Sequence, residues 1–204
     1  MKNLYDEVYF ERGIENNLSC YSNYRWMPEL TIPLAARIIE YLKISENDTV
    51  LDFGCAKGYL VYALRLLHRE AYGYDISEYA LSKAPVEIKE YVGNELDGHY
   101  TWIISKDVFE HISYEEIETV LKKLSNMCDN IFCVVPLGRN GTFNIPYYES
   151  DMTHIIREDL DWWCQMFQKS NFEIIESTYS VKYIKKNWSK WDDGNGFFIL
   201  RSIV

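Results

Sequence analysis

A short glycine-containing segment and a later aspartate have the residue types and spacing that bind a nucleoside. The segment, residues 50–58, has the sequence VLDFGCAKG, and Asp75 follows the run AYGY at residues 71–74. Glycines let a ligand approach the backbone closely, and a carboxylate at the tip of the next strand can accept hydrogen bonds from ribose hydroxyls. The sequence therefore predicts a site for a nucleotide-like cofactor.

A second group of polar residues could act on a substrate. Asp151, Thr153 and His154 follow a predicted strand, at the carboxyl ends of strands where open α/β sheets bind ligands. The imidazole of His154, with an ordinary pKa near 6.5, could take a proton from a substrate hydroxyl, with Asp151 orienting it. The equally weighted alternative is that the Thr-His pair only fixes the loop to the following helix.

Alternating strands and helices must position these residues. Apolar runs between turn residues predict strands at 49–53, 71–75, 88–92, 100–105, 130–135, 172–183 and 196–203. Apolar residues at helical spacing predict helices at 28–43, 58–69, 77–84, 113–127 and 157–169. Residues 1–27 are expected to be irregular, and residues 137–155 to form a long loop. This order predicts an α/β fold, a doubly wound, mostly parallel seven-stranded sheet with an antiparallel C-terminal edge.

Composition restricts the class of partner. The net charge of −10 disfavours nucleic acid, so we expect a small-molecule acceptor. No apolar run approaches the roughly 20 residues of a membrane span, and the N-terminus lacks a signal core. The five cysteines form no C-x-x-C pair, as is typical of reduced thiols in the cytoplasm. The four histidines are scattered along the sequence, so no metal site is expected.

The order of motifs from about residue 48 to the end resembles that of class I S-adenosylmethionine-dependent methyltransferases. Their first motif, Asp-x-Gly-x-Gly-x-Gly, is matched by Asp52, Gly54 and Gly58, with Ala56 replacing the middle glycine. The extra methyl is tolerable if Ala56 keeps a negative φ. The resemblance implies S-adenosyl-L-methionine as the cofactor. The implied cofactor-binding residues are Asp52, Gly54, Cys55, Ala56, Gly58, Asp75, Ile76, Asn94, Lys106 and Asp107.

Some of these residues have a structural alternative. Asp75 could instead be a carboxylate at a helix N-terminus, and Asn94 could serve only in a turn. Lys106 and Asp107 could simply pair with each other. The following Glu110-His111 pair is interpreted as a structural turn.

Aromatic and basic segments are candidates for contacts with substrate. Tyr24, Arg25 and Trp26 could fold over the pocket, where aromatic faces attract a sulfonium and Arg25 a carboxylate or phosphate. Their alternative is a hydrophobic flap. A nucleotide sugar could bind the later basic and aromatic residues, for which a solvated hairpin is the alternative. These are Lys182, Tyr183, Lys185, Lys186, Trp188, Lys190 and Trp191.

The resemblance implies one methyltransferase domain, residues 1–204, with an N-terminal aromatic lid and helix at 1–44 and a catalytic core at 45–204. We expect O-methylation of a small polar acceptor such as a sugar or glycan unit. The alternatives are N-methylation of a small molecule or amino sugar, a non-catalytic cofactor-binding module, and an NAD(P)-dependent oxidoreductase. The last is disfavoured because its G-x-G-x-x-G register matches only Gly54. A homodimer through the aromatic ends is left open.

Overall fold

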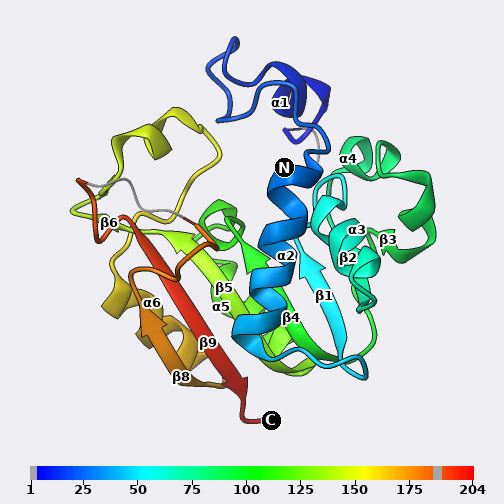
Figure 1. Ribbon diagram of the computed structural model, residues 1–204. Coiled ribbons are helices and arrows are strands. Elements are labelled where there is room, and N and C mark those ends of the chain that lie inside the picture. The colour runs from blue at the N-terminus through cyan, green and yellow to red at the C-terminus, as the bar shows by residue number, and fades with distance from the viewer. Residues whose placement is uncertain (1–3, 186–189) are drawn as a thin grey trace. The chain divides into compact units, whose positions relative to one another are not determined.

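A seven-stranded sheet carries the loops of interest (Figure 1). The computed structural model describes residues 4–185 and 190–204. The strands of the sheet are β1 (Thr49–Phe53), β2 (Glu70–Tyr74), β3 (Val92–Gly93), β4 (Tyr100–Lys106), β5 (Cys128–Pro136), β8 (Phe172–Thr178) and β9 (Asn195–Ser202). Their order is β3-β2-β1-β4-β5-β9-β8, and β9 is antiparallel to both β5 and β8. The predicted fold class, mostly parallel with an antiparallel C-terminal edge, is confirmed.

The chain divides into two units, residues 1–97 and 98–204, which are described in turn. In the first unit, β1, β2 and β3 pair in parallel. Its helices are α1 (Glu7–Arg12), α2 (Pro28–Leu42), α3 (Tyr59–Leu66), α4 (Glu78–Ser82) and the 3-10 helix η1 (Val86–Tyr91). Pro28 suits the first turn of α2, where its missing N–H has no intrahelical partner. Because α3 begins directly after Gly58, the loop after β1 is short and tightly placed.

Two elements of the first unit differ from the prediction. Residues 7–12, expected to be irregular, form α1 because the Asp6 side chain accepts the N–H of Tyr9, and Tyr9 and Phe10 are buried. The strand expected at 88–92 is mostly η1, and only Val92–Gly93 pairs with β2. In both places tertiary contacts decide the structure, and a local sequence pattern does not contain them.

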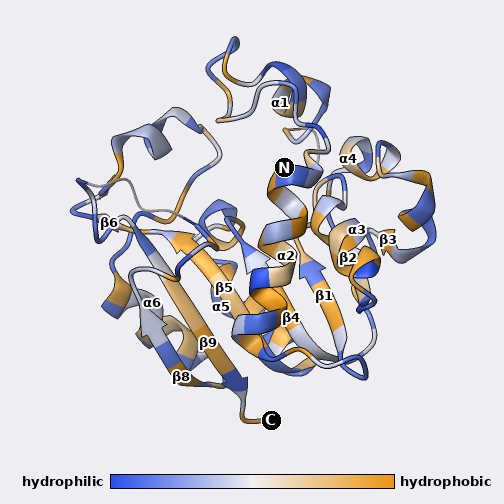
Figure 2. Ribbon diagram, in the orientation of Figure 1, coloured by the Kyte–Doolittle hydropathy of each residue, from blue (hydrophilic) through white to orange (hydrophobic). Residues whose placement is uncertain are grey.

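In the second unit, β4 and β5 pair in parallel. Residues 131–135 of β5 are fully buried, and the strand is coloured as hydrophobic in Figure 2, as expected for a central strand covered on both faces. The helices are the 3-10 helix η2 (Phe109–His111), α5 (Ile117–Ser125) and α6 (Leu160–Lys169). The last begins later than predicted because Asp159 caps it, accepting the N–H of Trp162.

The segment after β5 is more ordered than the predicted loop. It contains a small hairpin, β6 (Gly138–Arg139) and β7 (Thr142–Phe143), and the 3-10 helix η3 (Pro146–Ser150). The N–H groups of Ile155 and Ile156 both donate to the carbonyl of Glu110, at 2.7 and 3.0 Å. These bonds hold residues 151–156 against η2. Among the described residues, no helix has the length and apolar character needed to cross a membrane.

Candidate functional site

The loop after β1 has the left-handed backbone that its glycines predict. Gly54 has φ of 82° and Gly58 of 73°, and the N–H groups of Gly54 and Cys55 donate to the carbonyl of Tyr74 at 2.8 and 3.0 Å. Ala56 also has a positive φ, 50°. The condition set for its methyl group, a negative φ, is therefore not met. The loop keeps a conformation in which an L-residue is strained at this position.

Asp75 holds this loop from the end of β2. Its Oδ2 accepts the N–H of Ala56 at 2.7 Å, and its Oδ1 accepts the N–H of Ser77 at the start of α4, also at 2.7 Å. Burial raises the pKa of this carboxyl, against the lowering effect of the backbone N–H donors. A carboxylate has about four acceptor sites, so each oxygen keeps room for a hydroxyl donor. The helix-terminal alternative is therefore compatible with binding ribose.

There is open space beside Gly93, next to Asp75. Gly93 lies beside it, because the Asp75 N–H donates to the Gly93 carbonyl at 3.0 Å. A Cβ added to Gly93 would meet no heavy atom within 4 Å. The predicted residue Ile76 follows Asp75 after β2 and is half-buried, and Asn94 follows β3 directly and is exposed. Asp75, Gly93 and Asn94 thus lie at the carboxyl ends of neighbouring parallel strands, where such sheets bind cofactors.

Asp52 near the end of β1 and Cys55 in the loop are buried side chains. A Cβ at Gly73 would come within 2.7 Å of the Cys55 Sγ. Gly73 is therefore needed to make room for the thiol. Burial raises the pKa of Cys55 well above its ordinary value, which makes it a packing residue and a poor nucleophile.

An unpredicted ion pair ties the N-terminal segment to the loop. The ammonium of Lys57, only 5% exposed, bonds to the carboxylate of Glu11 and donates to the carbonyl of Tyr24 at 2.5 Å. Lys57 was visible in the motif, but Glu11 lies 46 positions away and nothing in the sequence connects them. In Figure 1 the N-terminal segment accordingly lies beyond the arrowhead of β1.

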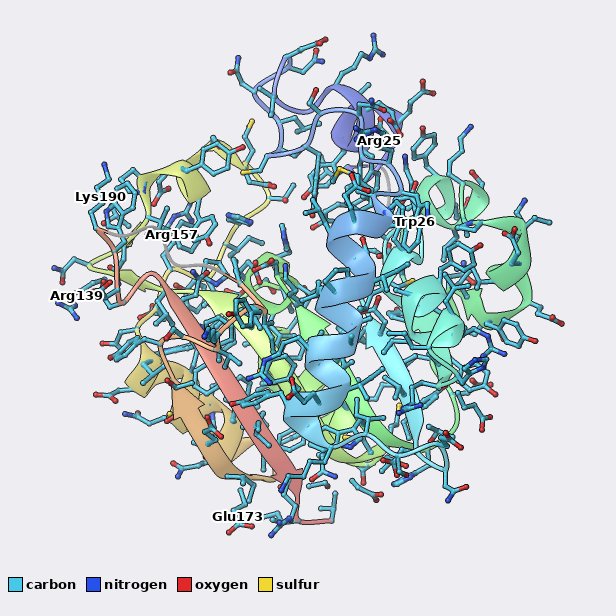
Figure 3. The ribbon with its side chains drawn as sticks, in the orientation of Figure 1. Arg25, Trp26, Arg139, Arg157, Glu173 and Lys190 are labelled. Atoms are coloured by element: carbon cyan, nitrogen blue, oxygen red, sulfur yellow. The ribbon has the colours of Figure 1, made fainter. Side chains whose placement is uncertain are left out.

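The three predicted substrate residues lie in or next to this segment. Tyr24 packs in an aromatic cluster with Phe10 and Tyr59, at ring-centroid distances of 5.8 and 5.3 Å. Trp26 contacts the ring of Tyr62 at 5.0 Å, whereas Arg25 is exposed. Figure 3 shows Arg25 and Trp26 near the junction with α2. The packing of Tyr24 and Trp26 fits the flap alternative, and their contact with substrate stays a prediction.

In the second unit, Lys106 and Asp107 belong to an ion-paired group at the end of β4. Asp107 bonds to the ammonium of Lys106 at 2.5 Å and to that of Lys185. Burial acts to raise the pKa of Asp107, but the two lysines outweigh it and hold the pKa below its ordinary range. The pairing alternative is therefore realised, and contact with the cofactor stays a prediction. Asp107 has φ of 59°, which marks a tight turn there.

His154 is buried beside two other titratable residues, Glu110 and His111, and the sequence did not predict that they would meet. Its ring lies 4.6 Å from that of His111, and its Nε2 lies 3.9 Å from carboxylate oxygens of Glu110 and of Asp151. The Nδ1 of His154 lies 2.8 Å from the carbonyl of Tyr148, so Nδ1 carries the proton and Nε2 the lone pair. Burial lowers the pKa of His154, although Asp151 opposes the effect, which favours the neutral ring.

Asp151 does not orient His154 by a hydrogen bond. Its Oδ1 accepts both the N–H and the hydroxyl of Thr153, at 2.9 and 2.6 Å. The Tyr148 carbonyl, 2.8 Å from Nδ1, orients the His154 ring instead, whereas an Asp151 carboxylate oxygen lies 3.9 Å from Nε2, too far for a hydrogen bond. Thr153 in turn lies 2.8 Å from the Nδ1 of His111. Glu110 and His111, interpreted as a structural turn, thus belong to the same cluster as His154.

The C-terminal basic and aromatic segment is only partly described. Lys186 and Trp188 lie outside the described residues. Lys190 lies over the ring of Trp191, with its Nζ 3.9 Å from the centroid. Lys185 pairs with Asp107 and lies over the Tyr148 ring at 4.9 Å, so it belongs to the second unit's polar cluster.

Comparison with solved structures shows a shared fold at low sequence identity. A putative methyltransferase from Haloferax volcanii, in complex with the Trm112 methyltransferase activator, is 16% identical over 86% of this chain and 91% of its own, with a TM-score of 0.64. An S-adenosylmethionine-dependent methyltransferase from Clostridium acetobutylicum is 12% identical over 83% of this chain and 91% of its own, with a TM-score of 0.62. Magnesium protoporphyrin IX methyltransferase from Synechocystis PCC 6803 is 14% identical over 98% of this chain and 90% of its own, with a TM-score of 0.59.

Comparison of sequences adds the family. No curated protein matches the chain at a significant level. The model of a methyltransferase domain family matches residues 25–177, which include the loop after β1, Asp75 and His154. The chain therefore belongs to this methyltransferase domain family, and it shares its fold with the solved methyltransferases described above.

Proposed function

We propose that this enzyme methylates a hydroxyl group of a small polar acceptor, such as a sugar or glycan unit, and that His154 removes the hydroxyl proton. The observation that supports this most directly is the buried, neutral imidazole whose Nδ1 is fixed by the Tyr148 carbonyl. A hydroxyl is a weak nucleophile at neutral pH and needs a base, whereas a neutral amine already has its lone pair. A prepared base therefore favours oxygen over nitrogen as the acceptor atom.

The cofactor is assigned to the first unit. Asp75 would accept the ribose hydroxyls, Gly54 and Gly58 would let the methionine part approach the loop, and Asn94 would meet the base. The open space beside Gly93 and the remaining acceptor capacity of Asp75 fit such a ligand. When bound, S-adenosylmethionine supplies an electrophilic methyl group on a sulfonium. Lys106 and Asp107 at the end of β4 are proposed to face its methionine part.

The chemistry assigned to the protein is alignment and proton transfer. The Nε2 lone pair of His154 would accept the acceptor's hydroxyl proton, and the nearby carboxylate of Asp151 would stabilise the imidazolium that forms. Such a base typically contributes about 10²–10⁴-fold to the rate. The remaining rate enhancement would come from holding acceptor and methyl group in line.

The assignment of the ribose site is tested by Asp75→Asn. An amide keeps the shape of the side chain and an acceptor for the Ala56 N–H, but it loses one acceptor oxygen. We expect S-adenosylhomocysteine to bind about 10- to 100-fold more weakly, corresponding to about 1–3 kcal/mol, as measured by calorimetric titration. Asp48→Asn, in the turn before β1, is the matched control and should bind as the wild type does. Equal affinity in both variants would remove Asp75 from the site.

The hydroxyl acceptor is tested with methyl-labelled S-adenosylmethionine and a panel of sugars, nucleotide sugars and amino sugars. We expect label in the hydroxyl-bearing compounds, and a loss of about 10²–10⁴-fold in kcat for His154→Gln with cofactor affinity unchanged. His99→Gln, an exposed histidine before β4, is the control. Labelling of amino sugars alone, with His154→Gln fully active, would establish N-methylation instead.

The same panel of acceptors distinguishes a methyltransferase from a non-catalytic cofactor-binding module. It predicts cofactor binding with no labelled product from any acceptor. The neutral imidazole of His154 favours turnover over binding alone, because its Nε2 lone pair could accept a substrate proton. We further propose that the chain acts as a single domain. We also propose that it works in the cytoplasm, which its five free cysteines support.

A further inference from the structure

Three ligand-type side chains meet in the second unit at the turn after β4. Glu110, His111 and His154 each offer one donor atom, and these atoms lie within 4.8 Å of one another. The backbone fixes their proximity, since Ile155 and Ile156, next to His154, donate to the carbonyl of Glu110. Ligands bound to one cation at about 2.0–2.2 Å lie roughly 3–4 Å apart, so a small inward rotation of the side chains suffices.

Glu110 gives independent evidence for a missing ligand. Its side chain is 0% exposed, and neither carboxylate oxygen has a hydrogen-bond partner in the described part of the chain. Buried carboxylates are normally paired, hydrogen-bonded or bound to a metal, because an unpartnered one is costly. The group is thus poorly satisfied by the protein alone.

The two histidines are arranged as metal ligands usually are. The Nδ1–H of His154 donates to the Tyr148 carbonyl, which leaves the Nε2 lone pair free to bind a metal ion, 3.9 Å from a Glu110 carboxylate oxygen. The Thr153 hydroxyl donates to Asp151, so its oxygen can accept the Nδ1 proton of His111. Ligating histidines almost always donate their other N–H to such a partner, which fixes the tautomer and the ring.

We propose that Glu110, His111 and His154 bind one divalent transition-metal ion that keeps positions open for oxygen atoms of the acceptor. Two imidazoles and one carboxylate suit Zn²⁺, Fe²⁺ or Mn²⁺ better than Mg²⁺ or Ca²⁺, which prefer oxygen ligands throughout. Three protein ligands leave coordination positions for substrate. Vicinal hydroxyls, or a hydroxyl beside a carbonyl, are the acceptor groups that could occupy two such positions.

The binding of a cation does not depend on the proposed function. The role of the cation in methyl transfer does rest on that function. A bound hydroxyl is acidified by the cation and releases its proton to water, because the O–H bond is polarised. His154 then serves as a ligand, and the base role proposed above applies to the cation-free protein. No metal site was expected because the histidines are scattered along the sequence. In the fold, however, the rings of His111 and His154 lie 4.6 Å apart.

The binding test uses Co²⁺ and Zn²⁺ alone, with the full chain first freed of metal by chelation. We expect one Co²⁺ per chain, with visible absorption bands of a nitrogen- and oxygen-ligated ion and displacement by Zn²⁺. Glu110→Gln and His154→Gln should each weaken binding at least tenfold. His99→Gln, which changes an exposed histidine outside the cluster, should bind as the wild type does.

Folding and function are checked separately. Urea unfolding of each variant reports whether the chain, including the second unit with the substituted residue, is still folded, so loss of metal with an unchanged unfolding midpoint supports the site. No saturable Co²⁺ binding by the wild type, or equal binding by Glu110→Gln and wild type, would overturn it. Metal binding does not require turnover, so a cation held without methyl transfer would reject the proposed function and leave the metal site standing.

Discussion

At the scale of single residues, Ala56 is the position where the loop after β1 is strained. Its φ of 50° lies in the left-handed region, which costs an L-residue about 1–2 kcal/mol, whereas glycine adopts it freely. We expect Ala56→Gly to stabilise the protein by about 0.5–1 kcal/mol, since glycine's greater freedom in the unfolded chain offsets part of the relief. Urea unfolding measures the difference.

Ala63→Gly is the matched control for this substitution. Ala63 lies inside α3, where glycine lowers helix stability by about 1 kcal/mol, so this variant should lose stability. Destabilisation by Ala56→Gly of the same size as by Ala63→Gly would show that the loop is not strained in solution.

The residues of the site were unequally predictable from the sequence. Gly54, Gly58 and Asp75 could be found because a motif places them within one strand-loop-helix-strand unit. The role of Glu110 could not be found, because its side chain becomes conspicuous only when burial leaves it without a partner. Its neighbours His111 and His154 are joined through the backbone bonds of Ile155 and Ile156, which no local pattern specifies.

At the scale of elements, the buried strands were predictable and the short pieces were not. β1 and β4 follow from apolar runs that must be buried wherever they pack. By contrast, α1 has only six residues, too few to be stable alone, and it depends on the burial of Tyr9 and Phe10. The two-residue β3 exists only because Gly73 and Tyr74 of β2 are there to pair with it.

The attachment of the N-terminal segment to the loop is the element-scale feature open to test. Lys57→Met removes a buried ammonium that binds Glu11 and the Tyr24 carbonyl. We expect a loss of about 1.5–3 kcal/mol in urea unfolding, as for hydrogen bonds to charged groups. We also expect faster proteolysis between residues 12 and 25. Lys122→Met, which removes an exposed pair with Glu118, should change stability by about 0.5 kcal/mol or less.

The same contact predicts a pH dependence. Burial acts to raise the pKa of Glu11, but the hydrogen bonds from Lys57 and Tyr79 outweigh it, and the pKa is lowered. A group with a lowered folded-state pKa contributes stability above its unfolded pKa, and this is lost as the pH falls towards the folded value. The difference in stability between wild type and Lys57→Met should therefore shrink as the pH falls below about 4.5. A difference that stays constant down to pH 3 would contradict this assignment.

At the scale of the whole molecule, cofactor binding should be visible as thermal stabilisation. A ligand present at 100 times its Kd stabilises the folded state by about 2.7 kcal/mol. In a chain of 204 residues this raises Tm by about 5–10 °C. We expect such a shift with S-adenosylmethionine and S-adenosylhomocysteine, measured by differential scanning fluorimetry. A comparable shift with NAD would contradict the assignment of the site.

The fold as a whole was predictable because strand and helix alternate throughout the chain, and that order permits few sheet topologies. The acceptor was not, because the side chains proposed to meet it come from η2 and the loop before α6, which are far apart in the sequence.

The contact between Cys55 and Gly73 has a consequence for how this sequence can change over evolutionary time. The two residues share one small volume, since a methyl group at residue 73 would come within 2.7 Å of the sulfur. An alanine at position 73 would press most closely on the side chain at position 55, and also on Val61 at 3.0 Å, so a smaller residue at position 55 should make it easier to accommodate. Among natural homologues, the sizes of the side chains at these two positions should vary inversely, as a covarying pair.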